Sequence, residues 1–405
     1  MKQLELFSGI GGFRRALDLL GRDFSVKFQT IAYSEIDKYA SNTYKAAFSK
    51  DSLEIGDIIS FNKDENNISQ LPNFELVTGG FPCQPFSMMG AQNGFNDSRG
   101  GLFFEIIKIL KIKRPKFVLL ENVRNLITHD KGKTIKRITD ELKSCGYHVF
   151  YDVFNTSNFG LAQTRNRVYI FATTLETANF SFNSTEIQKV YETKLKGKCS
   201  LLYQKNTHEI LEKKVDDKFY LSEKIKPTIL ANGSKNYIVD SSINPLIARP
   251  LTATMVKLHR ACQDNYFSDG FIKSKNPYDY VKINFSKEEL AEQRIRKLTP
   301  KEAFILQGFD DDYFSKIQKS GTSQAQLYKE AGNAVSVNTV YAICYYIFIH
   351  CGFGRSGIRT HVIYTSKVLE ALFFKEGFAI SRKRSSIHFE ISRVLRQIDM
   401  SALSV

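Results

Sequence analysis

The sequence lacks the patterns that mark several common classes of protein. Its six cysteines form no C-x-x-C pair, so neither a zinc site nor a disulfide framework is indicated, and free thiols are expected. It contains no apolar run of about 18 residues, the length of a membrane-spanning helix. The apolar stretch at the start is too short for a signal peptide. We therefore expect a cytoplasmic, globular protein without a membrane partner.

Length and charge set the next expectations. The chain has 405 residues, 42% of them hydrophobic and 24% charged. This is an ordinary composition for a globular protein, with room for two domains or for one large domain with an insertion. The formal net charge is +15. Such a surplus favours a polyanionic partner such as nucleic acid.

Residues 1–175 alternate short apolar runs with helical patterns. This alternation predicts βαβ units and a doubly wound, mainly parallel α/β sheet. Ligands of such sheets bind at the carboxyl ends of the strands. The expected strands are residues 2–7, 28–34, 74–79, 116–123 and 167–173, and the expected helices include residues 102–111 and 134–146.

The alternation stops at about residue 180. Residues 186–297 carry 21 Lys and Arg against 14 Asp and Glu, with recurrent turn signals. This favours a smaller, irregular segment that reads nucleic acid, although a lysine-rich solvated surface remains an alternative. We predict a catalytic and cofactor-binding domain at 1–185, a target-recognition domain at 186–293, and a return segment at 294–350 that completes the catalytic domain.

Regular structure is expected again in the return segment. Thr299 and Glu302 have the spacing of a capping box, with Pro300 at the first helical position. Residues 334–350 are predicted to form a buried helix. The tail at 351–405 carries nine basic and four acidic residues. It could be a docked module, an accessory contact to a nucleic-acid backbone or a dispensable extension, and we favour the last.

The segment GGFPCQPFS at 79–87 places Cys83 between two prolines and after two glycines. Proline is excluded from helix interiors and from central strands, so Cys83 is expected on a stiff, irregular turn. A buried packing cysteine does not need such a setting. The pattern therefore indicates a nucleophile.

The segment FSGIGG at 7–12 follows a predicted strand and opens a predicted helix. Its glycines allow a ligand to approach the backbone closely, and the helix N-terminus offers unpaired N–H groups. Glu35 and Asp57 follow, each near the expected end of a strand. In this order the three features favour a nucleoside-bearing cofactor, although loop glycines and solvated acids are an alternative.

Two further motifs carry charged side chains beside predicted strands. Glu121, in ENV at 121–123, ends an apolar run and is either a helix cap or a general acid. Arg165 and Arg167, in QTRNR, are two residues apart, so strand alternation sends both to one face. They suit an anion or a base edge, or they are a pair of surface arginines.

Together these motifs resemble the DNA (cytosine-5) methyltransferase family. FSGIGG resembles its cofactor loop, FPCQPFS its nucleophile loop, ENV its acid motif and QTRNR its arginine motif. The segments at 296–309 and 331–340 resemble two later blocks of the family, the second of which completes the cofactor site. Order and spacing match from residue 3 to about residue 345, apart from the variable middle.

The resemblance implies methyl transfer from S-adenosylmethionine to C5 of cytosine, with no metal. Cys83 would add to C6 as a thiolate and make C5 nucleophilic. Glu121 would act as the acid at N3, and Arg165 would hold O2, with Arg167 also in the catalytic set. The target base must leave the duplex, so a second lobe that grips DNA is required.

The resemblance also implies ligand-binding residues. Glu35 would bind the ribose hydroxyls, and Asp57 and Ile58 the adenine. The residues assigned to the cofactor are Phe7, Gly9, Ile10, Gly11, Gly12, Glu35, Asp57, Ile58, Pro82, Leu102 and Asn333. Those assigned to double-stranded DNA are Gln84, Ser87, Arg249, Thr252 and Thr254. We expect a monomer, with a restriction endonuclease for the same DNA sequence as a candidate partner.

Other enzyme classes fit less well. A zinc deaminase needs P-C-x-x-C after H-x-E, but Cys83 is followed by QPF, and the H-x-E at 388–390 lies in the tail. An amino-group methyltransferase would carry the motif D/N/S-P-P-Y/F. The nearest match, NPY at 276–278, lacks the second proline. A tRNA-methylating relative usually carries a C-F-T tripeptide, which is missing. A non-catalytic relative would have lost Cys83, Glu121 or Arg165.

Overall fold

A seven-stranded sheet forms the centre of the computed structural model. Its strand order is β3-β2-β1-β4-β5-β7-β6. Strands β1 to β5 pair in parallel, whereas β7 runs antiparallel to both β5 and β6. The strands are β1 (Lys2–Leu6), β2 (Gln29–Tyr33), β3 (Leu53–Glu54), β4 (Leu76–Gly80), β5 (Phe117–Val123), β6 (His148–Asn155) and β7 (Asn166–Thr173). The structure describes residues 1–48, 51–82, 101–176, 180–231, 233–234, 237–238, 242–257 and 262–351.

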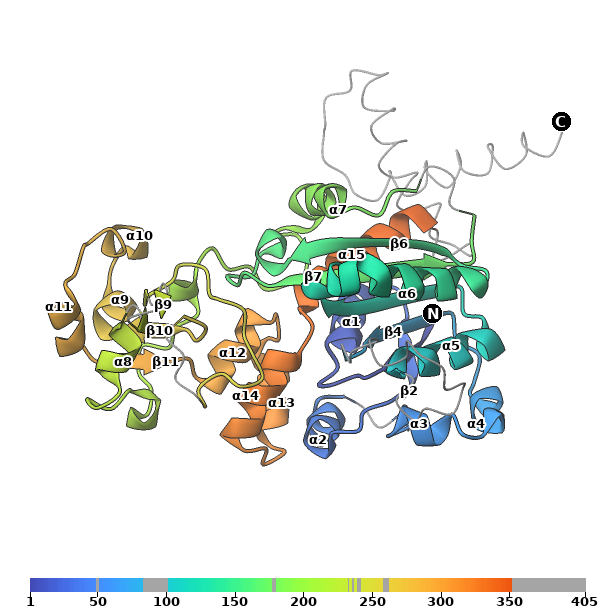
Figure 1. The fold of residues 1–405 in the computed structure, drawn as a ribbon, viewed down its shortest axis with the longest axis horizontal. Coiled ribbons are helices and arrows are strands. Elements are labelled where there is room, and N and C mark those ends of the chain that lie inside the picture. The colour runs from blue at the N-terminus through green and yellow to red at the C-terminus, as the bar shows by residue number, and fades with distance from the viewer. Residues whose placement is uncertain are drawn as a thin grey trace, which may run out of the picture. The chain divides into compact units, whose positions relative to one another are not determined.

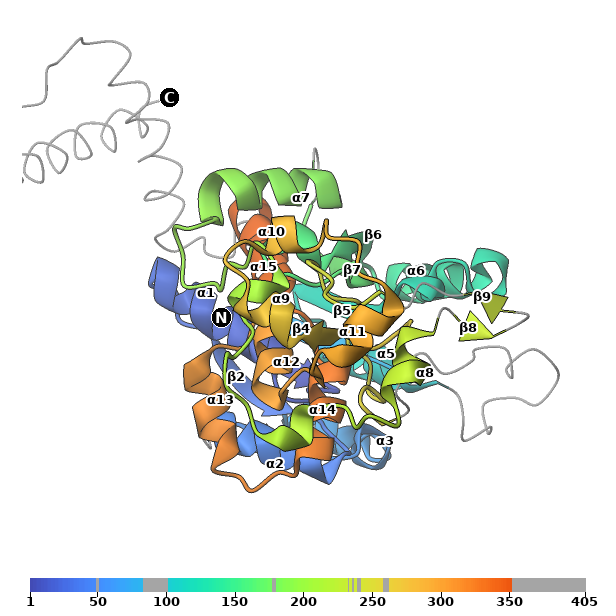
Figure 2. The same cartoon turned by 90° about the vertical axis from the view of Figure 1, so that its left-hand side faces the viewer.

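Helices cover both faces of the sheet (Figure 2). Helices α1, α7 and α15 pack together on one face, and α3 to α6 pack on the other. Their bounds are α1 (Gly12–Phe24), α2 (Lys38–Ala47), α3 (Ile58–Phe61), α4 (Glu65–Gln70), α5 (Leu102–Lys113), α6 (Lys133–Ser144), α7 (Ser184–Val190) and α15 (Val337–Cys351), with short helices η2 (Arg124–Leu126), η3 (His129–Gly132) and η4 (Thr156–Phe159). Strand residues are apolar on both faces, as in Leu119 and Leu120, because both faces are covered.

The return segment brings the chain back to its beginning. It contains α12 (Pro300–Leu306), α13 (Asp311–Gln318), α14 (Gln324–Asn333) and α15. Figure 1 shows α15, in red, beside α1, in blue, and the Tyr341 hydroxyl donates to Asp23 Oδ2 at 2.8 Å. Among the described residues, the stretch Gln324–Cys351 is long and apolar enough to cross a membrane, but 83% of its apolar window is buried. It is therefore part of the core.

Between the sheet and the return segment, the elements are short. They are η5 (Tyr191–Leu195), η6 (Thr207–Glu209), η7 (Asp217–Phe219), α8 (Lys226–Leu230), β8 (Gly233–Ser234), β9 (Tyr237–Ile238), β10 (Tyr266–Ser268), α9 (Asp269–Lys273), α10 (Pro277–Tyr280), α11 (Lys287–Glu292) and β11 (Ile295–Lys297). A small apolar cluster that includes Ile229, Tyr266 and Ile295 lies among them. The loss of βα alternation after about residue 180 is thus confirmed.

Most of the expected elements are confirmed. The five predicted strands and both named helices form, and Thr299 and Glu302 make the predicted capping box at α12. Strand β6 was not predicted, because this edge strand is only partly buried and has no continuous apolar run. Helix α15 begins at Val337 rather than Ala334, because Ala334–Ser336 is not helical.

Other predictions have no counterpart in the described residues. Cys83, Gln84 and Ser87 lie outside them, as do residues 352–405 of the tail. Met1–Cys351 forms one compact unit by contacts, so the proposed boundaries within it, at residues 185 and 293, remain predictions.

Candidate active site

A pocket of about 650 Å³ lies at the carboxyl ends of the parallel strands, where the ligands of open α/β sheets bind. Residues at or just after the carboxyl ends of β1 to β5 line it, together with residues at the start of β7, residues of α14 and the turn after α14. The predicted site residues that line it are Phe7, Gly9, Ile10, Glu35, Asp57, Ile58, Pro82, Leu102, Glu121, Arg165, Arg167 and Asn333.

The loop after β1 is held against the end of β2. Phe7 N donates to Ser34 Oγ at 3.1 Å, and Gly9 N donates to Glu35 Oε2 at 2.8 Å. Gly9 has a φ of +53°, and no described heavy atom lies within 4 Å of the position that its Cβ would take. The loop therefore presents open space to the pocket at Gly9, at a backbone angle that favours glycine.

Gly11 and Gly12 were assigned to the cofactor, but they do not line the pocket. A Cβ at Gly11 would lie 2.3 Å from Cε2 of Phe48, and one at Gly12 would lie 2.5 Å from Cγ2 of Val335. These two glycines are therefore needed for close packing beneath the loop, whatever the loop binds.

The carboxylates of Glu35 and Asp57 both hold backbone groups as well as lining the pocket. Glu35 accepts from Gly9 N through one oxygen and from Asp37 N through the other, at 2.8 and 2.7 Å. Burial raises the pKa of Glu35. Asp57 is the N-cap of α3, and the Ser60 hydroxyl lowers its pKa. Since a carboxylate has about four acceptor positions, both retain capacity for a ligand.

Glu121 lies at the end of β5 and pairs with Arg167. Arg167 Nε lies 3.0 Å from Glu121 Oε1. Burial raises the pKa of Glu121, and the charges of Arg167 and Arg165 partly oppose the rise. Gly80, opposite Glu121 in the register of β4 and β5, leaves room for the carboxylate, since its Cβ would lie 3.4 Å from Glu121 Oε2.

Arg165 is buried and its guanidinium binds backbone carbonyls. Nη1 donates to Leu251 O at 2.9 Å, and Nη2 donates to Gly332 O and Ala334 O at 3.1 and 2.9 Å. Burial, assisted by Arg167, lowers its pKa to about 9, so Arg165 stays cationic at neutral pH. The two arginines therefore differ in their neighbours: Arg167 contacts Glu121, whereas Arg165 binds the carbonyls of segments that are distant in the sequence.

The turn at 249–255 lies against these segments through its backbone. Leu251 N donates to Gln163 Oε1 at 2.9 Å. A Cβ at Gly332 would lie 2.2 Å from the carbonyl carbon of Thr252, so only glycine allows this approach. Of the predicted DNA-binding residues in the turn, Arg249 donates to Ser242 O at 2.9 Å, Thr252 is partly buried and Thr254 is exposed.

The segment that carries Cys83 enters and leaves at the pocket. Pro82 and Leu102, the residues near its two ends, both line the pocket. Asn122 Nδ2 donates to Phe81 O at 2.8 Å, which fixes the end of β4 beside Glu121. The structure therefore brings the flanks of the predicted nucleophile segment next to the predicted acid.

Three charged residues of the pocket wall were not predicted from the sequence. Asp37, Lys329 and Glu330 line the pocket, and Lys329 Nζ donates to Asp37 Oδ2 at 2.5 Å. Two signals pointed to them. Asp37 closely follows Glu35, and Glu330 immediately precedes the AGN of the 331–340 segment.

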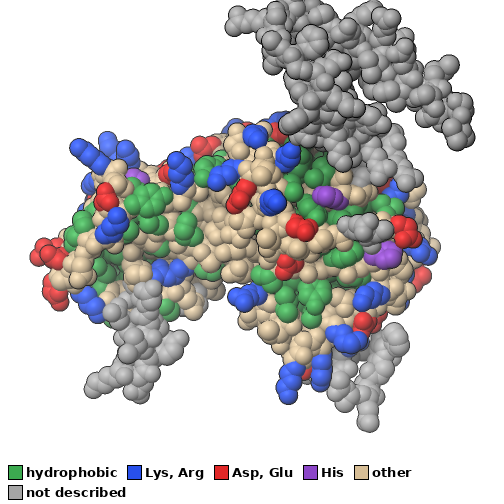
Figure 3. Space-filling model, turned by 90° about the horizontal axis from the view of Figure 1, so that it is seen from above, with side chains coloured by type: hydrophobic (Ala, Val, Ile, Leu, Met, Phe, Trp, Pro, Cys, Tyr) green, Lys and Arg blue, Asp and Glu red, His purple; other side chains and the backbone are tan. Residues whose placement is uncertain are grey.

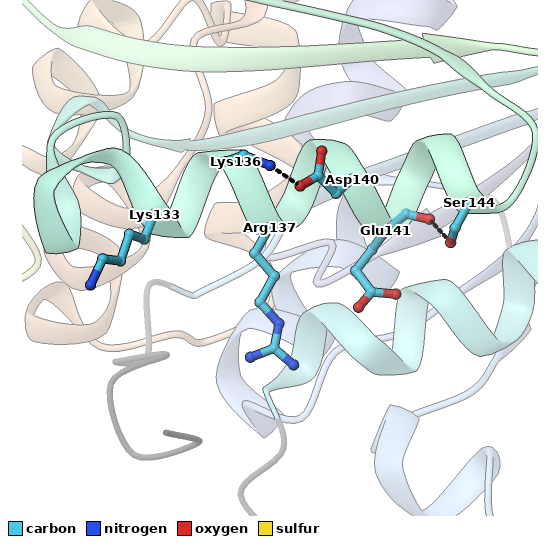
Figure 4. A pocket seen from close by; sticks show the side chains of 6 residues that line it. All are labelled: Lys133, Lys136, Arg137, Asp140, Glu141 and Ser144. Atoms are coloured by element: carbon cyan, nitrogen blue, oxygen red, sulfur yellow. Dashed lines mark hydrogen bonds and ion pairs between the residues drawn. The ribbon is translucent and has the colours of Figure 1, made fainter. Parts of the chain in front are cut away.

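A second hollow, of about 410 Å³, lies on α6 away from this site (Figure 4). All six lining residues come from that one helix, and Figure 4 shows the ion pair between Lys136 and Asp140 on its surface. Among the described residues, no group from another element converges on it, in contrast to the pocket at the strand ends. The described residues contain no group of three or more potential metal ligands.

A sheet of this order, with an antiparallel seventh strand and a glycine loop after the first, is the fold of the α/β methyltransferases. The chain belongs to the C-5 cytosine-specific DNA methylase family, whose model matches residues 1–348, and it is accordingly a DNA (cytosine-5) methyltransferase. It is 37% identical to the type II methyltransferase M1.ScrFI of Lactococcus lactis subsp. cremoris over 348 residues, which cover 84% of this chain and 76% of that protein.

Two other similarities agree with this membership. The chain is 35% identical to the type II methyltransferase M.SsoII of Shigella sonnei over 353 residues, covering 84% of this chain and 78% of that protein. The crystal structure of the S. pombe Dnmt2 methyltransferase superposes with a TM-score of 0.65 at 19% identity, covering 87% of this chain and 100% of that one. At this identity, the second similarity shows the fold alone.

Proposed function

We propose that this chain methylates C5 of a cytosine within a specific short sequence of duplex DNA, through a covalent adduct between Cys83 and C6, as the modification enzyme of a restriction-modification system. The observation that carries the proposal is the single pocket shared by the cofactor loop, the flanks of the Cys83 segment, Glu121 and Arg167. The names of the relatives, type II methyltransferases, support a partner endonuclease.

In the proposed reaction, the Cys83 thiolate adds to C6 and the electron pair moves toward N3. Glu121 supports that charge as a general acid, for which its raised pKa is suited. S-adenosylmethionine, when bound, would supply an electrophilic methyl group, which C5 takes as the S–CH3 bond breaks and S-adenosylhomocysteine leaves. The C5 proton is then lost and the thiolate leaves C6. The covalent adduct thus divides the difficult methylation of C5 into a sequence of easier steps.

The geometry favours Arg167 over Arg165 for the contact with O2 of the base. Arg167 is paired with Glu121 and lines the pocket with its side chain 20% exposed. The three carbonyl contacts of Arg165 leave it less able to reach a ligand. We therefore assign Arg165 to positioning and Arg167, with Glu121, to the base.

The residues present fit S-adenosylmethionine. Gly9 leaves open space beside the backbone, and Glu35 and Asp57 retain acceptor capacity on the pocket wall. Glu330 offers a buried carboxylate oxygen that has no partner among the described residues. A pocket of about 650 Å³ lies within the usual range for cofactor sites, which is roughly 300–1,000 Å³.

We assign DNA recognition to residues 186–293, and within them to the turn at 249–255. The positive charge alone does not locate the DNA surface: on the face that Figure 3 shows, Lys and Arg side chains alternate with Asp and Glu. The proximity of the turn to Arg165 and Gly332 is the stronger argument, because a flipped base must enter the pocket next to the protein segment that reads its neighbours.

Expression of the chain in a methylation-free bacterial host tests the proposal. Bisulfite sequencing of the host DNA is expected to show methylated cytosines at one short sequence and nowhere else. Cys83→Ser is the matched control, which should leave the DNA unmodified. Unmodified DNA from cells that make soluble wild-type protein would contradict the proposed function.

A segment exchange tests the assignment of recognition. Residues 186–293 taken from a relative of different specificity should change the methylated sequence and leave the reaction intact. A chimera that is active on the original sequence would place recognition elsewhere.

A further inference from the structure

Glu330 is a carboxylate of the pocket wall whose hydrogen bonding is incomplete. The residue is 5% exposed and lines the pocket from α14. Thr43 Oγ1 donates to its Oε2 at 3.0 Å. Its Oε1 is buried and has no partner within the described part of the chain. Leaving a buried acceptor unpaired is costly, so a ligand that supplies a donor there would relieve the cost.

The charged groups around Glu330 leave it without a cation of its own. Asp37 and Glu35 face it from the end of β2 and the start of α2, and buried Tyr313 faces it from α13. The neighbouring Lys329 donates instead to Asp37. Burial raises the pKa of Glu330 to about 7; the Thr43 hydroxyl and Lys329 lower it, whereas Asp37 and Glu35 raise it.

We propose that Glu330 binds the α-ammonium group of S-adenosylmethionine through Oε1 and loses its own proton as the cofactor binds. The inference rests on the proposed function. The ribose and adenine already have assigned partners in Glu35 and Asp57, whereas the amino-acid end has no assigned acidic partner. A cationic donor is also the group that a poorly solvated carboxylate binds most strongly.

The pH dependence follows from the folded pKa of about 7. Below pH 7 the free protein holds a proton on Glu330 that must leave when the cation binds. Affinity therefore falls as the pH falls through 7, by up to about tenfold per pH unit. At higher pH the ligand's own α-amino group loses its proton, and with it the charge that Glu330 would bind. Affinity is expected to peak between these limits.

Calorimetry with S-adenosylhomocysteine tests the proposal without requiring turnover. At pH 6.5, titrations of the full chain in two buffers of different ionisation enthalpy should show release of about 0.8 proton per ligand. Glu330→Gln keeps the shape and the Thr43 contact but has no proton to lose. It should release none and bind about tenfold or more weakly at pH 7.5. Glu65→Gln, the same change at an exposed position, is the control and should behave as wild type.

Two comparisons separate binding of the ammonium group from a structural role. 5′-Methylthioadenosine lacks the amino-acid end, so Glu330→Gln should leave its affinity unchanged. Thr43→Val removes the donor that lowers the pKa of Glu330, so it should move the pH midpoint of S-adenosylhomocysteine affinity upward.

Three outcomes would overturn the inference. They are proton release that persists in Glu330→Gln, equal loss of affinity for both ligands, and an unmoved midpoint in Thr43→Val. If wild-type protein bound neither ligand, the proposed function itself would fail. If wild type bound both and any of the three outcomes appeared, only the role of Glu330 would fail.

Discussion

The sheet and the segment that follows it are stabilised in different ways. In the sheet, continuous apolar strands such as β5 are buried between two layers of helices. In the described part of residues 206–297, the helices are at most six residues long and the strands two or three. Side-chain caps hold many of these short elements. The capping residues are Asn206, Asp216, Ser268, Asn276 and Ser286.

The contacts between the two regions use mainly the backbone of the second. Arg165 donates to the carbonyl of Leu251, Thr164 N donates to the carbonyl of Ala248 at 2.9 Å, and Gln163 accepts from Leu251 N. Backbone groups are the same whatever the side chain. The sheet region can thus hold the turn at 249–255 while the turn's side chains vary, which would separate chemistry from specificity if the turn reads DNA as proposed.

Loss of the nucleophile should have the largest effect, and only on chemistry. Cys83→Ser is expected to reduce methyl transfer by more than about three orders of magnitude, because a serine hydroxyl does not ionise near neutral pH. Binding of DNA and S-adenosylhomocysteine should persist. Wild type should form a covalent adduct with DNA that carries 5-fluorocytosine, visible on denaturing gels. A serine variant with a tenth of normal turnover would end the assignment.

Glu121→Gln should also reduce the rate of methyl transfer without weakening cofactor binding, but by a smaller factor than Cys83→Ser. Glutamine can donate to the base but cannot deliver a proton, and general acid help is worth ~10²–10⁴-fold in rate. Single-turnover rates should fall by that range while cofactor affinity changes little. If the two fell equally, Glu121 would be a structural residue that holds Arg167.

Breaking the buried ion pair between β11 and α12, where the segment of short elements meets the return segment, should affect stability instead. Arg296 donates to both oxygens of Glu302, at 2.9 and 2.7 Å, and both side chains are fully buried. Arg296→Met leaves the Glu302 carboxylate buried without its cation, although the N–H groups of Thr299 and Glu212 still donate to it, and the expected cost is about 3–5 kcal/mol. Thermal or urea unfolding measures the loss. Arg296→Met with Glu302→Gln removes both charges and should recover part of it; no recovery would argue against the charge as the cause.

Arg165→Lys should weaken the link between the regions. Lysine keeps the charge but lacks the planar fork that serves three carbonyls, so we expect a loss of about 1–3 kcal/mol in DNA binding and a smaller loss in cofactor affinity. Fluorescence anisotropy and calorimetry measure the two. A variant that loses the O2 contact alone would show a reduced rate with normal DNA affinity. That result would assign the contact with O2 of the cytosine to Arg165 instead of Arg167.

The sequence predicted those parts of the site that depend on local pattern. Continuous apolar runs identified the parallel strands, and a capping box identified the start of α12. The site residues at strand ends, such as Glu35 and Glu121, come together because parallel strands end at one edge. Each of these signals lies within a short stretch of chain.

The parts that were missed depend on distant neighbours. Alternation placed Arg165 and Arg167 on one face, but the carbonyls of Leu251, Gly332 and Ala334 decide that Arg165 is the buried one. Likewise, the glycine loop predicted a ligand contact at Gly11, whereas the ring of Phe48 explains that glycine. No pattern within the loop or strand carries this information.

The smallest effect is expected from the tail. The family match ends at residue 348, and every residue assigned to the cofactor or to the reaction precedes it. Deleting residues 356–405 should leave turnover and target sequence unchanged. Residues 351–405 carry nine basic residues against four acidic ones, and all but Arg355 lie in the deleted segment. This charge could add affinity that is independent of DNA sequence and fades with salt, so the truncated protein should show at most a shallower salt dependence of DNA binding. Insolubility of the truncated protein, or a weaker affinity for S-adenosylhomocysteine, would show instead that the tail belongs to the catalytic fold.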